Sequence, residues 1–217
     1  MSDFFEVYQK RMNLKGRNKE EAKINSGKHI LEKTFDSSLS SYTLLVDNVM
    51  TDVIAVSGKT SKEKTFLFKP NYVGRTGMII VFESSSFLVT DYKTNLINSS
   101  AKARQCNNSI TLTSELSESV VIGYDDLGRP VYDDVESEEV VIPCICDTVI
   151  KNDDTERAIN LPQEQMLVTI PYTEHEDLNY DKELILYGSH FKIIGIDDTE
   201  SIDKVGLRRL TLERVAD

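Results

Sequence analysis

The chain has 217 residues, 40% hydrophobic and 28% charged, an ordinary balance for a globular protein that excludes wholesale disorder. That length suits one large domain or two small ones. The net charge of −11 is uneven: residues 1–35 hold eight Lys and Arg against five Asp and Glu, and the rest holds 17 against 31. An acidic body repels phosphate and argues against ordinary DNA or RNA binding. The basic start predicts a contact with nucleic acid or an acidic neighbour, or a solvated helix face.

Residues 1–40 predict a helical arm. Large apolar side chains recur at helical spacing near its start, at Phe4, Phe5, Tyr8 and Met12. A break is expected around Gly16, and a second helix over 18–36, with Asn25-Ser26-Gly27 as a candidate interruption. So short an apolar stripe is marginal alone, and we expect it to dock on its own barrel or on a neighbouring subunit.

From Tyr42 onward, short β-rich runs alternate with turn residues, which predicts a mainly β protein. Strands are expected near 42–47, 51–57, 64–69, 77–83, 86–91, 101–106, 109–113, 138–151, 165–170, 183–187, 190–197 and 206–213. Pro130 favours an edge hairpin around residues 119–134. The predicted organisation is an arm (1–40), a first β unit (41–113), an acidic β-hairpin insertion (114–138) and a second β unit (139–217).

A weak internal repeat supports two units. Residues 77–89 resemble 181–193, two hairpins in which Phe87 and Phe191 match at an offset of 104. Upstream, 65–70 resembles 166–171, and downstream, 101–106 resembles 205–210. Two related small β-barrels or one duplicated sandwich follow from this pattern, with chance similarity of alternating hairpins as the competing explanation.

The residues give little support for catalysis, a cofactor or a metal. Cys144 and Cys146 are expected to point to opposite sheet faces, and with Cys106 they are interpreted as plain thiols. His190 takes the repeat position of Ser86, which favours exposed scaffold over a catalytic base. The remaining candidates are His29, His175 and the acidic pairs Asp125-Asp126, Asp133-Asp134, Asp153-Asp154 and Asp197-Asp198, which turn chemistry explains without a metal.

Two further passages carry a family resemblance. One is Ser86–Asp91 leading to Ala101–Ile110, which contains Cys106-Asn107-Asn108, and the other runs from Arg157–Pro162 to Phe191–Asp198. Both resemble virion proteins of tailed bacteriophages of Gram-positive hosts, in particular neck or head–tail joining proteins. The resemblance spans most of the chain through diffuse β patterns, and the acidic hairpin at 114–140 matches it least.

The resemblance implies a head-closure or head–tail connector protein: a non-enzymatic homo-oligomeric ring between portal or adaptor and tail, assembled in the host cytoplasm and located in the virion. DNA would pass nearby without specific binding, and we expect no membrane partner, since no apolar run approaches a bilayer span. Candidate subunit contacts are Phe4, Phe5, Tyr8, Met12, Tyr124, Tyr132, Tyr172 and Tyr180. The alternatives are a tail-terminator ring, a nucleic-acid-binding double barrel using the basic arm, and a metal-assisted hydrolase using Asp pairs and His190.

Overall fold

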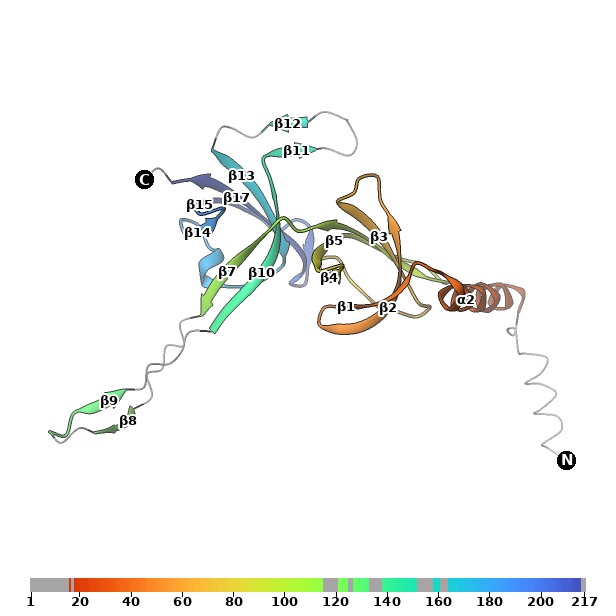
Figure 1. Ribbon diagram of the computed structural model, residues 1–217, viewed down its shortest axis with the longest axis horizontal. Coiled ribbons are helices and arrows are strands. Elements are labelled where there is room, and N and C mark those ends of the chain that lie inside the picture. The colour runs from red at the N-terminus through yellow and green to blue at the C-terminus, as the bar shows by residue number, and fades with distance from the viewer. Residues whose placement is uncertain are drawn as a thin grey trace. The chain divides into compact units, whose positions relative to one another are not determined.

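The computed structural model describes residues 16, 18–114, 121–124, 127–132, 138–151, 158–160 and 164–215 (Figure 1). They divide into a first unit, Met1–Gln105, and a second unit, Cys106–Asp217, each with its own buried core. The predicted mainly β fold, with two related units behind a helix, is confirmed. The division falls before the strand expected at 109–113, because that strand pairs within the second unit.

Helix α2 (Lys19–Ser37) confirms the predicted second helix. It begins where the Asn18 side chain accepts a hydrogen bond from Glu21 N at 2.8 Å, so a free amide of the first turn is satisfied. The expected interruption at 25–27 is absent, since these residues lie inside the helix. Phe35, near the C-terminal end, is the buried side chain that anchors α2.

The first unit is a closed six-stranded antiparallel barrel in the order β1-β2-β3-β6-β5-β4. Its strands are β1 (Ser41–Val46), β2 (Val49–Ser57), β3 (Glu63–Phe68), β4 (Ile79–Phe82), β5 (Ser85–Thr94) and β6 (Ser99–Gln105). Pairing of Leu45 with Val81 and of Val46 with Ile80 closes the barrel. Alternation along the strands places aromatic side chains inside, where Phe66, Phe82 and Phe87 meet edge to face.

The second unit repeats this order as β7-β10-β13-β17-β15-β14. The strands are β7 (Asn108–Ser114), β10 (Glu138–Asp147), β13 (Gln165–Pro171), β14 (Glu183–Leu186), β15 (Ser189–Asp197) and β17 (Val205–Arg214). Added to them are the hairpins β8 (Val121–Tyr124) with β9 (Pro130–Tyr132) and β11 (Val149–Lys151) with β12 (Ala158–Asn160), the short strand β16 (Ser201–Ile202) and the 3-10 helix η1 (Glu176–Leu178).

The duplicated hairpin agrees in backbone detail. The turn Glu83-Ser84 has φ of 48° and 63°, and Tyr187-Gly188 has 51° and 73°, as a two-residue type I′ turn requires. Val89 exchanges backbone hydrogen bonds with Gly77 and Met78, and Ile193 does the same with Asp181 and Lys182. The second strand of each hairpin also carries a register shift at the equivalent place, between Val89 and Asp91 in β5 and between Ile193 and Gly195 in β15. These shared features make the two units structural repeats.

The flanking matches are shifted from the sequence prediction. Tyr92 pairs with Ala101, and the equivalent Ile196 pairs with Leu210, so Ala101 corresponds to Leu210 rather than to Val205. Phe66 pairs with Ala101 as Val168 pairs with Leu210, so Phe66 corresponds to Val168 rather than to Leu167. The physical reason is that the connections on both sides of the hairpin are longer in the second unit, 172–182 against 69–78 before it and the one carrying β16 after it, so alignment without gaps misplaces both flanking strands.

Candidate interaction site

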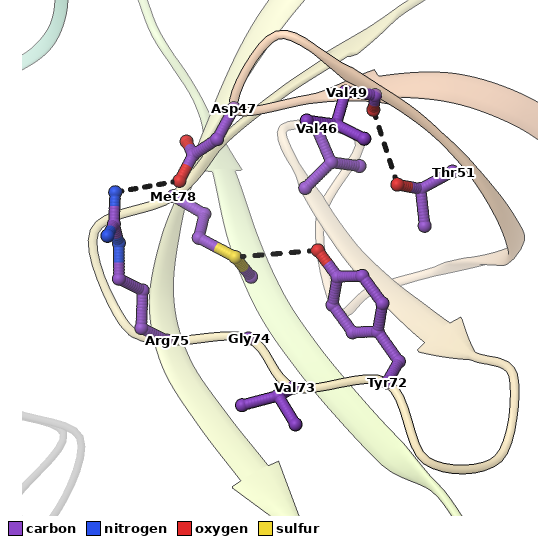
Figure 2. A pocket seen from close by; sticks show the side chains of 9 residues that line it. All are labelled: Val46, Asp47, Val49, Thr51, Tyr72, Val73, Gly74, Arg75 and Met78. Carbon is purple, nitrogen blue, oxygen red and sulfur yellow. Dashed lines mark hydrogen bonds and ion pairs between the residues drawn. The ribbon is translucent and has the colours of Figure 1, made fainter.

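A pocket of about 480 Å³ lies in the first unit, between the β1–β2 turn and the loop from β3 to β4 (Figure 2). Its size is typical of a binding pocket. The lining is mostly apolar and comprises Val46, Asp47, Val49, Thr51, Tyr72, Val73, Gly74, Arg75 and Met78. Val49 is 63% and Val73 89% exposed, so the pocket opens onto a hydrophobic surface.

Polar contacts hold the loop that forms one side of this pocket. Arg75 Nη2 donates to Asp47 Oδ2 at 2.9 Å, and Asp47 Oδ1 accepts from Ile79 N at 2.9 Å (Figure 2 shows the first). The hydroxyl of Tyr92 accepts from Gly74 N at 2.8 Å and donates to Tyr72 O at 3.2 Å. A pre-formed loop of this kind keeps the pocket open for an occupant without a large ordering cost.

Tyr72 forms the apolar base of the pocket. Its ring stacks on Phe68 with centroids 4.2 Å apart, and its hydroxyl lies 3.8 Å from Met78 Sδ. Burial raises the pKa of the Tyr72 hydroxyl above its ordinary value, so the group stays neutral at physiological pH. The base therefore presents aromatic and thioether surface, which suits an apolar or aromatic side chain.

In the second unit, Arg208 pins the loop after β13. Its side chain is 11% exposed, and Nη1 donates to Thr173 O at 2.7 Å. Nε and Nη2 donate to the two carboxylate oxygens of Asp198, and the guanidinium lies 4.6 Å from the Tyr172 ring centroid. Hydrogen bonding to Asp198 raises the pKa of Arg208 further above its ordinary value. Through these contacts Arg208 holds the loop after β13 in place.

The expectation that Cys144 and Cys146 point to opposite sheet faces is wrong, although both are free thiols as expected. Residues two apart in a strand share a face, and both thiols are buried with their Sγ atoms 3.7 Å apart. The hydrogen bond with the Cys146 thiol, and to a lesser extent burial, raises the pKa of Cys144. Cys144 therefore stays a protonated thiol at neutral pH. Pairings across the sheets make Cys144 and Cys146 equivalent to Val53 and Ala55, ordinary positions of the first unit's β2.

The Cys-Asn-Asn passage has a physical role at the start of the second unit. The Asn107 side chain donates from Nδ2 to Cys146 O at 2.8 Å and accepts at Oδ1 from Cys146 N at 2.7 Å. The amide thus imitates a strand partner for Cys146, just before β7 begins at Asn108. Sequence reasoning singled out this passage by resemblance and missed its structural basis.

The predicted subunit contacts are distributed over several places. Phe4, Phe5, Tyr8 and Met12 lie outside the described residues, as does the side chain of Tyr132. Tyr124 in β8 is 73% exposed and Tyr180 is 60% exposed. Tyr172 is half-buried and engaged internally, beneath Arg208 and with its hydroxyl donating to Glu174. The pocket residues Val49 and Val73 were not among the predictions, because single exposed valines carry no sequence signal.

The titratable candidates lie apart. His190 Nδ1 is 3.5 Å from Glu183 Oε2, and His175 Nδ1 accepts from Asp177 N at 3.2 Å. Asp197 accepts from Thr199 N, and the other three acidic pairs lie outside the described residues. Within the described ranges, no three His, Cys, Asp or Glu side chains gather as a cation site would require. None of the helices described is long and apolar enough to cross a membrane.

The fold therefore defines a tandem protein of two equivalent six-stranded barrel-like units, with a preformed apolar pocket in the first. Residues 108–213 match the YomX C-terminal domain. This range runs from the first residue of β7 almost to the end of β17, and so covers the core strands of the second unit.

The chain is also similar to a SPbeta prophage-derived uncharacterized protein, YomX, of Bacillus subtilis strain 168. The two are 30% identical over 141 residues, which cover 64% of this chain and 65% of that protein. The aligned part thus spans somewhat less than two thirds of the relative's length. Together, the two similarities indicate a phage-derived protein.

Proposed function

We propose that this chain is a structural, non-enzymatic virion protein that forms a ring in the neck of a tailed phage, between portal and tail. The observation that carries the proposal is the match of the second unit's barrel to a domain named for a prophage protein. The resemblance of residues 86–110 and 157–198 to neck proteins supports the position within the particle.

The tandem fold suits ring formation. A ring needs heterologous contacts, in which one face of a subunit meets a different face of the next. The two units share a fold but differ in their residues, so one chain offers two different faces. At one pair of equivalent outward positions, Val81 is 36% and Ile185 is 64% exposed, so each unit presents an apolar side chain to a neighbour there.

Charge suits a conduit for DNA. Residues 36–217 carry 17 basic against 31 acidic side chains, an excess that repels phosphate. Where this surface faces the channel, the wall would let DNA pass without binding it. Tight binding of the purified protein to DNA at physiological salt would contradict this part of the proposal.

Deletion of the coding sequence from the phage or prophage tests the proposal. A ring that joins head and tail is required late, so induced lysates should contain filled heads and complete tails that remain separate. A plasmid copy of the full chain should restore joined particles. Normal tailed particles from the deletion strain would contradict the neck role.

A further inference from the structure

The second unit carries a helical turn, η1, in the loop that corresponds to one side of the first unit's pocket. Along the pairings, Val46 and Thr51 of the pocket correspond to Leu112 and Ile142. Both belong to one buried cluster with Leu178, which is fully buried and lies on η1. In the second unit, Leu178 on a helical turn thus belongs to the buried cluster that contains the counterparts of Val46 and Thr51.

A hydrogen bond places η1 at the same edge of the sheet. Asp177 Oδ2 accepts from Thr113 N at 3.2 Å, and Thr113 corresponds to Asp47 at the pocket rim. In the first unit, the loop from β3 to β4 forms no helical turn, and Val73 on it is 89% exposed. The first unit's loop therefore brings no helical turn to this edge of its sheet, and the pocket there has room for an apolar side chain from elsewhere.

We propose that residues 1–15, the first part of the arm, of a second copy of this chain fill the pocket with one of their large apolar side chains. The arm carries four of them at helical spacing, namely Phe4, Phe5, Tyr8 and Met12. A helix this short is marginal alone and gains stability by burying that stripe. Lys10, Arg11 and Lys15 outnumber Asp3 and Glu6 in residues 1–15 by one charge, which adds a weak attraction to the acidic remainder of the chain.

The geometry of α2 favours a second copy over the arm's own pocket. Lys28 Nζ donates to Asn71 Oδ1 at 2.8 Å and Gly27 lies against Ile97, so the middle of α2 is held on the barrel. The turns before this contact are mostly exposed, and at 1.5 Å per residue they extend about 13 Å beyond it. The N-terminal end of α2 therefore points away from its own barrel (Figure 1). This inference rests on the proposed ring, in which an arm reaching the next subunit makes a heterologous contact.

Photo-crosslinking of the full chain tests the inference. Benzoyl-phenylalanine replaces Val73, and isotopically heavy and light copies are mixed, irradiated over a concentration series and analysed by mass spectrometry. We expect crosslinks to residues 1–15 that join heavy with light chains. The probe at Leu39, which is 99% exposed and outside the pocket, is the matched control and should give none. Crosslinks only within one chain, or none to residues 1–15, overturn the inference.

A second measurement separates this inference from the ring itself. The exposed substitution Val73→Asp should leave the unfolding midpoint unchanged and reduce the oligomer population in native mass spectrometry at least tenfold, whereas Leu39→Asp should not. Rings that survive Val73→Asp overturn the arm contact and leave the neck proposal standing. Particles that assemble normally without the protein overturn the neck proposal, whatever the crosslinks show.

Discussion

Arg208 and Asp198 form a two-pronged ion pair in the second unit, with Nε to Oδ1 at 2.7 Å and Nη2 to Oδ2 at 2.8 Å. Ser99 begins β6 and donates to Tyr72 O at 3.2 Å, while Arg208 in the corresponding β17 donates to Thr173 O. Each unit thus uses a buried polar side chain to fasten the loop after its third strand. Asp198 is the additional partner that the larger, charged Arg208 requires.

Replacement of Asp198 by Asn should destabilise the protein. A partly buried guanidinium then loses its charged acceptor, and hydrogen bonds to charged groups contribute about 2 kcal/mol. Urea unfolding of the full chain measures the loss. Asp203→Asn, in an exposed turn, is the matched control and should stay within about 0.5 kcal/mol of the wild type. Equal free energies of unfolding for the two variants would show that the ion pair of Arg208 with Asp198 does not stabilise the fold.

Asn107→Ala should also destabilise the chain, by about 2 kcal/mol, because the backbone N–H and C=O of Cys146 each lose a partner. The same substitution at the exposed Asn179 removes a side-chain amide without this loss and serves as the control. Hydrogen exchange of the Cys146 amide should accelerate in Asn107→Ala alone. Unchanged protection there would contradict the assigned role of Asn107.

The double substitution Cys144→Val with Cys146→Ala copies Val53 and Ala55 of the first unit. It should cost less than about 1.5 kcal/mol, because hydrophobic replacements of similar volume are tolerated in cores. Cys144→Ser, which buries a hydroxyl among apolar neighbours, should cost more. Chemical unfolding under reducing conditions ranks the variants, and the reverse order would mean that the thiols do more than fill the core.

Carboxyl NMR titration tests the exposed contact of Glu174 with Lys204 and Tyr172. Hydrogen bonds from Lys204, then from Tyr172, hold the pKa of Glu174 below its ordinary value. Because the pKa of Glu174 is lower in the folded protein than its unfolded value of about 4.3, the contact stabilises the folded protein above that pH. This stabilisation is lost as the pH falls through the folded-state pKa. Lys204→Gln should raise the pKa of Glu174, whereas Lys192→Gln, which breaks a contact to Asp181, should leave it unchanged.

Local pattern predicted much of the fold. Alternating apolar runs around tight turns identified the hairpin with Phe87 and its repeat with Phe191, because a two-residue turn fixes register within a few residues. The helix at 18–36 was predicted with an error of one residue at each end. Gly27 lies within that helix even though glycine weakens helices, because a Cβ there would meet Ile97 at 2.8 Å and close packing favours its absence.

Long-range features were harder to predict. The correspondence of Ala101 with Leu210 depends on pairings across the sheet and on the longer connection through β16, which no local window contains. The pocket at Val73 arises where the β1–β2 turn meets a loop more than twenty residues away, as Figure 2 shows. The engagement of Tyr172 by Arg208 likewise needs the tertiary fold, so its ring looked equivalent to that of the exposed Tyr180.

Labelling of intact particles shows most directly whether the protein occupies the junction of head and tail. Purified particles from the phage or prophage that encodes the chain are incubated with gold-conjugated antibody against it and imaged by electron microscopy. A ring in the neck predicts gold at the junction of capsid and tail. Gold elsewhere on the particle, or particles without gold while the protein remains free in the lysate, would contradict it.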